Sequence, residues 1–274
     1  MGYQARPGVY TTRHAGRGVP RDTIHHMAHE DRPTSAPASA VRHVAVVADG
    51  DVPSRDRLDV AWPGWADGVE EVIAADGGLA RAPIAGLVPT LLVGDLDSVS
   101  GELVADAAAR GLPIERAATT KDESDAELAM LAAVARGATR ITVVGAFGGP
   151  RLDHALANVW LLAHPALAAT DVVLLDARSR ITLIVAPGPD GGTVTRSLAG
   201  RPGDLVSLLP FAGDVDGVTT RGLRYALDDE PLVVGPARGL SNVRLRPDAG
   251  VTVRRGRLMV VETAAIETGL SSES

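Results

Sequence analysis

The chain has no cysteine among its 274 residues. This absence excludes a disulfide framework, a thiol nucleophile and a thiolate metal site, so any metal must be held by oxygen or imidazole ligands. The sequence also lacks an apolar run of the roughly 18 to 20 residues that span a bilayer, and its N-terminus has no hydrophobic signal core. We therefore expect a cytoplasmic protein that makes no membrane contact.

Lysine is almost absent as well. The net charge is -7, and of the 27 basic residues only Lys121 is a lysine. A general nucleic-acid binder or a binder of anionic membranes would carry a basic patch, so we predict neither kind of partner. The single lysine is either a chance of composition or a compact ammonium group required beside phosphate oxygens, where it acts as a point charge.

Three familiar site motifs are missing from the sequence. Without GxxxxGK[ST] there is no Walker-type nucleotide site, and without GxGxxG after the first strand a standard dinucleotide domain is disfavoured. Without GxSxG there is no nucleophile elbow of a serine hydrolase. The hydrophobic content of 45% is nevertheless enough for one large domain or two modest ones.

The pattern along the chain divides it into four segments. Residues 1–40 show no apolar periodicity and are predicted to be a disordered tail. Residues 41–186 alternate strand-like with helical runs, which indicates an α/β catalytic domain with a layered, mostly parallel sheet. Residues 187–265 have short strands and frequent turns, typical of a smaller all-β sandwich domain, and residues 266–274 are predicted to be frayed.

The segment LLVGDLDS, residues 91–98, ends an apolar run and delivers Asp95 and Asp97. Such a run predicts a parallel strand, and parallel sheets bind ligands beyond the carboxyl ends of their strands. In an extended chain the two carboxylates point the same way, so both can reach one hard cation such as Mg²⁺. The alternative is a turn in which Asp97 caps a helix that begins near Val99 or Ser100.

Acidic residues recur where other apolar runs end. Asp76 follows EEVIAA, Asp125 precedes a predicted helix over residues 126–136, and Asp153 follows the strand-like run ITVVGAF. Because the carboxyl ends of parallel strands share one edge, these acids predict a single site for a polyanion.

The acids around Asp125 also have a structural interpretation. Asp122 or Ser124 can cap the helix, while Asp125 and Glu127 favour its positive N-terminal end. Both interpretations hold together if the cap aims Asp125 at the edge of the sheet.

The segment GAFGGPRLDH places two glycines and an arginine at the start of another predicted helix. Gly148 and Gly149 would let the backbone approach a ligand closely, and Arg151 suits a phosphate. The alternative is a tight connection with a solvated arginine. His154 is either a ligand contact or a residue of the helix surface, and Trp160 is predicted to lie in the core.

In the predicted β domain, polar residues gather in turn-rich segments. Thr219, Thr220, Ser241 and Asn242 are explained by turn chemistry, or alternatively by hydrogen bonds to a small heterocycle.

Taken in order, these motifs resemble those of the thiamine pyrophosphokinase family, also called thiamine diphosphokinases. The resemblance covers residues 43 to 263 and rests on six segments: ADGG (75–78), GDLDS (94–98), KDESDAE (121–127), GGPRLDH (148–154), GVTTRGLRYAL (217–227) and RGLSN (238–242). Together they imply an enzyme that transfers the pyrophosphoryl group of ATP to thiamine, forming thiamine diphosphate and AMP. They also imply a homodimer with its sites at the subunit interface.

The resemblance assigns roles to the residues as follows. Magnesium would be held by Asp95, Asp97 and Asp125. The catalytic residues would be Asp125, Asp153, Lys121 and Arg151, with Asp125 or Asp153 accepting the hydroxyl proton, and the ATP site would include Asp76, Gly77, Gly148, Gly149 and His154. Thiamine would be bound by Ser241, Asn242, Thr219 and Thr220. Two alternatives stay open: a pyrophosphokinase acting on another hydroxymethyl heterocycle such as a pterin, and a non-catalytic regulator that binds nucleotide or thiamine.

Overall fold

A computed structural model describes residues 41–118, 122–187 and 191–265 of the chain. The predicted tails over residues 1–40 and 266–274 lie outside the described residues, and so does Lys121. None of the helices among the described residues is long and apolar enough to cross a membrane.

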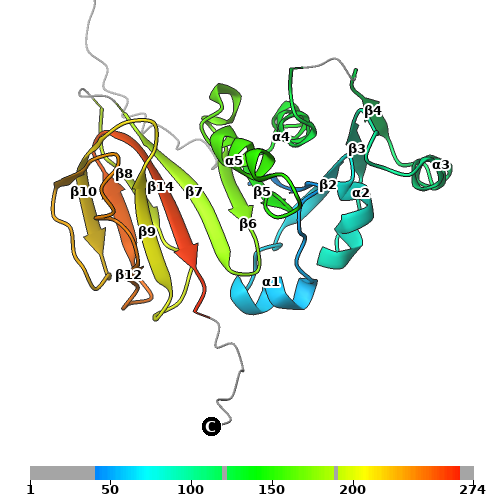
Figure 1. Ribbon diagram of the computed structural model, residues 1–274. Coiled ribbons are helices and arrows are strands. Elements are labelled where there is room, and N and C mark those ends of the chain that lie inside the picture. The colour runs from blue at the N-terminus through cyan, green and yellow to red at the C-terminus, as the bar shows by residue number, and fades with distance from the viewer. Residues whose placement is uncertain (1–40, 119–121, 188–190, 266–274) are drawn as a thin grey trace, which may run out of the picture. The chain divides into compact units, whose positions relative to one another are not determined.

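A sheet of ten strands runs through the described chain (Figure 1). Six neighbouring strands are parallel and stand in the order β4 (Ile114–Arg116), β3 (Leu91–Gly94), β2 (Val69–Ala75), β1 (His43–Val47), β5 (Arg140–Val144) and β6 (Asp171–Leu175). Every residue of β1 and β3 is buried, as is typical of parallel strands that are covered on both faces. The predicted parallel sheet is confirmed.

The order of these strands reverses at the centre of the sheet. From β1 the chain adds β2, β3 and β4 on one side, and then returns to add β5 and β6 on the other. Such a reversal opens a crevice at the carboxyl ends of the two central strands, which is where open α/β sheets bind their ligands. The fold therefore places a binding crevice next to the ends of β1 and β5.

Helices cover both faces of the parallel strands (Figure 1). They are α1 (Arg55–Ala61), α2 (Gly78–Arg81), α3 (Gly101–Ala109), α4 (Asp125–Ala135) and α5 (Leu152–Leu161), with short 3₁₀ turns at η1 (Ala82–Ala85) and η2 (Pro165–Leu167). On one face, Ala129 and Met130 of α4 pack against Val46 and Ile141 of the sheet. On the other face, Leu58 of α1 belongs to a second cluster that also contains both Trp62 and Trp65.

The remaining strands build a sandwich on the same sheet. Antiparallel strands β7 (Ser179–Ala186), β14 (Gly256–Thr263), β9 (Leu205–Pro210) and β12 (Asn242–Val243) continue the sheet beyond β6. A second sheet contains β11 (Glu230–Leu232), β10 (Val215–Arg221), β13 (Gly250–Val253) and β8 (Val194–Ser197). Residues of the two sheets share one buried cluster, so the predicted all-β part is confirmed, while its division from the rest at residue 187 stays a prediction.

The predicted core position of Trp160 is wrong. Its side chain is 59% exposed, and no residue of α5 is fully buried. The helix packs on the core through its partly buried Val159 and Leu161 instead. Trp160 is rotated away from these neighbours, and its ring lies 5.6 Å from that of Phe211, at an angle of 57°.

A buried ion pair links the two sheets of the sandwich. The carboxylate of Glu262 is 1% exposed; it accepts a hydrogen bond of 2.9 Å from Arg180 and another of 2.6 Å from the backbone N–H of Ala199. These contacts join β14, β7 and the loop after β8.

We predict that Glu262→Ala lowers the free energy of unfolding by about 3 to 5 kcal/mol, because it leaves the Arg180 charge and the Ala199 N–H without a partner. In Glu70→Ala, which removes an exposed ion pair with Arg42, we expect a change of at most about 1 kcal/mol. Urea unfolding of the two variants measures the difference. Equal losses of unfolding free energy would show that the buried Glu262–Arg180 pair stabilises the fold no more than the exposed Glu70–Arg42 pair.

Candidate active site

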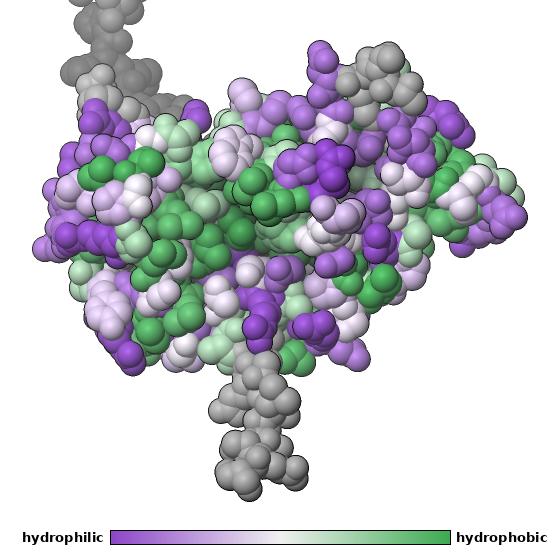
Figure 2. All heavy atoms as spheres, in the orientation of Figure 1, coloured by the Kyte–Doolittle hydropathy of each residue, from purple (hydrophilic) through white to green (hydrophobic). Residues whose placement is uncertain are grey.

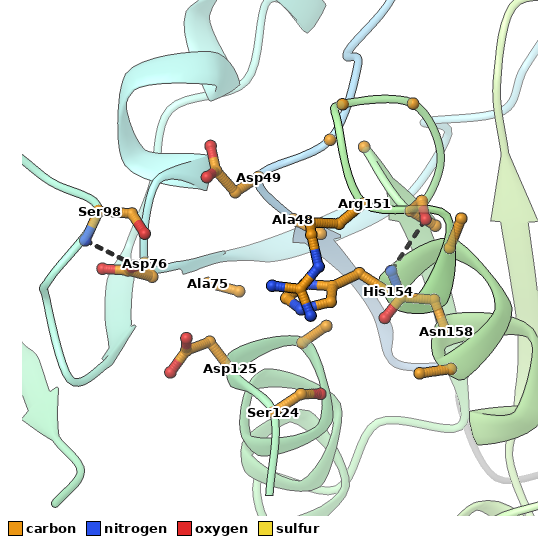
Figure 3. Close-up of a pocket in the computed structure, with 18 of the residues that line it drawn as sticks. Ala48, Asp49, Ala75, Asp76, Ser98, Ser124, Asp125, Arg151, His154 and Asn158 are labelled. Atoms are coloured by element: carbon orange, nitrogen blue, oxygen red, sulfur yellow. Dashed lines mark hydrogen bonds between the residues drawn. The ribbon is translucent and has the colours of Figure 1, made fainter. Parts of the chain in front are cut away.

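A cavity of about 510 Å³ lies at the crevice between the ends of β1 and β5. In Figure 3 three carboxylates face two basic side chains across it, and the residues that carry these groups are Asp49, Asp76, Asp125, Arg151 and His154. The cavity is therefore built from the ends of several strands and the starts of two helices, as the positions of the acidic motifs predicted.

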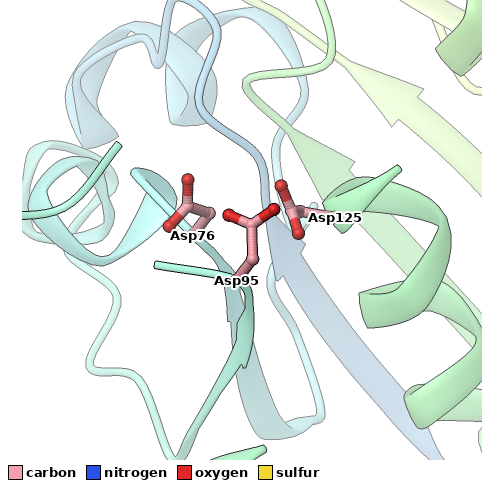
Figure 4. A group of neighbouring side chains, drawn as sticks. All are labelled: Asp76, Asp95 and Asp125. Carbon is pink, nitrogen blue, oxygen red and sulfur yellow. The ribbon is translucent and has the colours of Figure 1, made fainter. Parts of the chain in front are cut away.

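Three carboxylates stand close enough to share one cation. Oxygens of Asp76, Asp95 and Asp125 all lie within 4.8 Å of one another (Figure 4). Asp76 is 3% exposed; its Oδ2 accepts a hydrogen bond of 3.1 Å from the backbone N–H of Ser98. Its Oδ1 is buried without a hydrogen-bond partner among the described residues. A buried carboxylate oxygen without a partner is costly, and a bound cation would satisfy it.

The surroundings of Asp76 act against its charge. Burial raises the pKa of its carboxyl group above the ordinary value, hydrogen bonds from Ser98 oppose this, and the nearby carboxylates of Asp125 and Asp97 add to the rise. Its backbone has a φ of 45°, in the left-handed region that few aspartates adopt. Electrostatic cost and an unusual backbone at one residue are typical of functional sites.

Asp97 does not join this group of three, and the argument from an extended chain is wrong. Leu96 has a φ of 67°, so the backbone turns between the two aspartates. The backbone N–H of Asp97 donates to Oδ1 of Asp95 at 3.3 Å, and its own Oδ1 accepts from the Ser98 hydroxyl at 3.1 Å. The capping alternative is also wrong, because Ser100 is the N-cap of α3. A metal-binding role for Asp97 stays a prediction.

The start of α4 confirms the structural interpretation of its acidic motif, and a functional role for Asp125 stays a prediction. Ser124 is the N-cap, and its hydroxyl accepts from the backbone N–H of Glu127 at 3.2 Å, whereas Asp122 is exposed. The cap fixes the first turn of the helix, so Asp125 at its first position is held beside Asp76.

The start of α5 supplies a basic side chain, that of Arg151, to the cavity. Arg151 donates through Nε to Oδ1 of Asp153 at 2.9 Å, and both side chains are exposed. The hydrogen bond from Arg151 lowers the pKa of Asp153 to about 2, and the carboxylate in turn raises the pKa of Arg151. Arg151 and His154 line the cavity, whereas Asp153 does not. Paired in this way, Asp153 is a weak proton acceptor.

Asp49 and Asn158 line the cavity, and neither was predicted from the sequence. Asp49 follows β1 and pairs with Nε of Arg81 at 2.7 Å; it carries the same signal as the other acids, a carboxylate at the end of an apolar run. Asn158 donates to the backbone carbonyl of Ala146 at 2.8 Å, and nothing in its spacing marks it as part of the site.

Two of the three predicted glycines, Gly77 and Gly148, lie where neighbouring loops approach closely, whereas a Cβ atom on Gly149 would meet no atom within 4 Å. A Cβ atom on Gly77 would stand 2.2 Å from the carboxylate of Asp49, and one on Gly148 would stand 2.1 Å from that of Asp51. Gly148 and Gly149 line the cavity and Gly77 does not. Gly77 and Gly148 thus make room for carboxylates of the loop after β1, and the role of all three glycines toward ATP stays a prediction.

The predicted thiamine residues use their polar groups locally. The Asn242 side chain is buried; it accepts from the N–H groups of Tyr225 and Val243 and donates to the carbonyl of Tyr225. The hydroxyls of Thr219 and Thr220 accept from backbone N–H groups, and Ser241 is exposed. Among the described residues of the single chain, none of these four lines the cavity.

Comparison with known proteins identifies the family. The model of the thiamin pyrophosphokinase catalytic domain matches residues 66–174, and that of the thiamin pyrophosphokinase vitamin B1 binding domain matches residues 193–258. The thiamine pyrophosphokinase of Bacillus subtilis is 25% identical over 193 residues, which cover 70% of this chain and 86% of that protein.

Solved structures share the fold. The thiamin pyrophosphokinase of Geobacillus thermodenitrificans superposes with a TM-score of 0.66 at 25% identity, covering 82% of this chain and 99% of that one. The yeast thiamin pyrophosphokinase superposes with a TM-score of 0.64 at 15% identity, covering 83% and 88%. The two family models together match more than half of the chain, in the order catalytic then vitamin-binding domain. The chain therefore belongs to the thiamin pyrophosphokinase family.

Proposed function

We propose that the cavity between β1 and β5 is where this thiamine diphosphokinase transfers the pyrophosphoryl group of ATP to the hydroxyl group of thiamine. The products are thiamine diphosphate and AMP. The observation that supports this location is the group of three carboxylates across the cavity from Arg151 (Figure 3); one of them has a buried oxygen without a hydrogen-bond partner in the part of the chain that the structure describes. Acidic ligands beside a basic side chain suit a metal-bound polyphosphate.

The residues present fit a magnesium ion. Mg²⁺ prefers oxygen ligands, and Asp76, Asp95 and Asp125 offer carboxylate oxygens from three separate elements. Oδ1 of Asp76, which is buried and has no hydrogen-bond partner within the described ranges, is the specific mark of such a site. Bound magnesium would offset the repulsion between these carboxylates and the phosphate oxygens of ATP.

The cationic side chains would position the phosphates. Arg151 lines the cavity and carries a guanidinium group suited to phosphate oxygens; the sequence adds Lys121, which lies outside the described residues. Contact with phosphate would draw Arg151 away from Asp153, with which it pairs in the described chain. Asp125 and Asp153 are our candidates for accepting the thiamine proton.

A homodimer is the assembly that we propose. Leu152, Leu156 and Trp160 project from one side of α5, four residues apart, and are 74%, 47% and 59% exposed. Figure 2 shows apolar surface gathered over the middle of this face of the molecule. An apolar area of this kind on a monomer usually marks an interface. A second copy seated there would bring further residues toward the cavity, and Ser241, Asn242, Thr219 and Thr220 are our candidates for binding thiamine.

Release of AMP tests the function directly. The purified chain is incubated with ATP, Mg²⁺ and one alcohol, either thiamine or a hydroxymethylpterin, and AMP is quantified. We expect AMP to appear with thiamine and not with the pterin. AMP with the pterin alone would support the other pyrophosphokinase, and no AMP with either alcohol would support a binding protein. The cytoplasmic location stays a prediction from the sequence.

For the metal site, we predict that Asp76→Asn weakens Mn²⁺ binding, measured by electron paramagnetic resonance, by at least about tenfold and lowers turnover by at least about 100-fold, because a buried anionic ligand is lost. The resemblance to the family assigns Asp97 to the metal site as well, and this role predicts the same loss of turnover in Asp97→Asn. The control is Asp106→Asn, an exposed acid of α3, which should bind Mn²⁺ normally. Normal metal binding by Asp76→Asn would remove Asp76 from the site.

For the assembly, we predict that Trp160→Glu converts a dimer into a monomer, because a charge cannot be buried in the apolar interface without a partner. Val88→Glu is the control, since Val88 is 79% exposed on the loop before β3. Sedimentation equilibrium measures the mass of both variants. A Trp160→Glu chain that stays dimeric would show that α5 is not at the interface.

A further inference from the structure

His164 stands between the end of α5 and the turn η2, and its ring contacts both η2 and α4. It is the N-cap of η2, and its Nδ1 accepts a hydrogen bond of 3.1 Å from the backbone N–H of Ala166. Its Nε2 lies 3.5 Å from Oε1 of Glu127 in the first turn of α4, and the two side chains are 28% and 22% exposed. One partly buried ring thus joins two elements that are far apart along the chain.

The contacts of the His164 ring assign its proton. A backbone N–H group can only donate, so Nδ1 must be unprotonated where it accepts from Ala166. The neutral ring then carries its proton on Nε2, beside the carboxylate of Glu127. Both ring nitrogens are therefore engaged, and each serves a different element.

Glu127 belongs to the turn that carries Asp125. Its backbone N–H donates to the hydroxyl of the N-cap Ser124 at 3.2 Å, and Asp125 lies between the two as the first residue of the helix. A glutamate at this third helical position commonly binds back to the backbone of the N-cap, whereas the carboxylate of Glu127 reaches His164. The first turn of α4 is therefore held at two points, the Ser124 cap and the His164 contact.

The first turn of α4 needs such support because of the charges that it faces. An oxygen of Asp125 lies within 4.8 Å of oxygens of Asp76 and Asp95 (Figure 4). Repulsion between like charges at this distance pushes the start of α4 away from the sheet when no cation is bound. The carboxylate of Glu127 adds a further negative charge to the same turn, and the Nε2–H group of His164 offsets it.

Apolar packing sets the distance between η2 and α4. Leu167 of η2 is 3% exposed and belongs to the same buried cluster as Ala129 and Met130 of α4. These two residues of α4 lie beyond its first turn. His164 adds to this packing a polar contact with the first turn itself.

We propose that His164 is a positioning residue of the active site. Through Glu127 it holds the first turn of α4, so that Asp125 stays within reach of a metal shared with Asp76 and Asp95. His164 does not itself line the cavity. The inference rests on the proposed function and deepens it, because it adds a residue outside the cavity to those on which the metal site depends.

Two conservative variants separate the two contacts of the ring. In His164→Gln the amide nitrogen falls near the position of Nε2 and can donate to Glu127, but no acceptor is left for the N–H of Ala166. In His164→Asn the side-chain oxygen replaces Nδ1 as the acceptor of the N-cap, but the shorter side chain does not reach Glu127.

We expect His164→Asn to weaken Mn²⁺ binding, measured by electron paramagnetic resonance on the full chain, by about tenfold and to lower kcat by a similar factor. His164→Gln should keep both within about twofold of the wild type but unfold at a lower urea concentration, because it lacks the cap. A purely structural role would change metal binding and stability together. The control is Arg110→Gln, which breaks an exposed ion pair on α3 and should bind Mn²⁺ normally.

A double-mutant cycle tests the route through Glu127. Glu127→Ala keeps the backbone N–H that binds Ser124 and should weaken Mn²⁺ binding by about the same factor as His164→Asn, with no further loss when the two changes are combined. The cycle does not depend on the cap of η2, so it decides the question even if His164→Gln fails to fold.

Three results would overturn the inference. They are normal Mn²⁺ binding by His164→Asn, an equal loss of Mn²⁺ binding in His164→Gln and His164→Asn, and losses that add independently in the Glu127 cycle. Each is observed from metal binding alone. If the wild-type chain released no AMP with thiamine, the proposed function would fail, while the Mn²⁺ measurements would still decide the role of His164.

Discussion

Mutual repulsion among Asp76, Asp95 and Asp125 is the constraint on which the rest of the site depends. Three carboxylates whose oxygens lie within 4.8 Å of one another are costly unless other groups offset their charge. The three carboxylates are nevertheless brought together, because β2 and β3 end, and α4 begins, at the same edge of the sheet. The N–H of Ser98 offsets part of it at Asp76, and a divalent cation would offset the remainder. A group of three close carboxylates therefore suits a binding site better than a closed protein core.

The charges at this edge are separated in space. The acidic group lies on the side of the loop after β1 where α4 begins, and Arg57 of α1 and Arg81 of α2 line a separate hollow on the other side of this loop. A substrate with a metal-bound polyphosphate and an anionic leaving group requires both kinds of surface within one molecule's length. The reversal of strand order between β1 and β5 makes this possible, because it leaves the loop after β1 with space on both of its sides.

Much of the architecture could be predicted from local pattern. Apolar runs ending in aspartate marked the strand ends, and Asp122 or Ser124 marked the start of α4, where Ser124 is the cap, because both signals depend on neighbours in sequence. The failures depend on information that the pattern does not carry. The left-handed backbone at Leu96 turned Asp97 away from its expected direction. Periodicity identified the apolar side of α5 but not what covers it, so Trp160 was assigned to the core. Asp49 was overlooked although its signal was present, and Arg57, Arg81 and Arg178, which lie far apart in the sequence, line one hollow only in the folded chain.

The central claim is that Asp76, Asp95 and Asp125 jointly hold the metal of the reaction. Anomalous diffraction from crystals of the full chain grown with Mn²⁺ and a non-hydrolysable ATP analogue measures this most directly. The account predicts an anomalous peak at about 2.0 to 2.4 Å from a carboxylate oxygen of each of the three, including Oδ1 of Asp76. A peak held by Asp95 and Asp97 with Asp76 outside the coordination shell would contradict it.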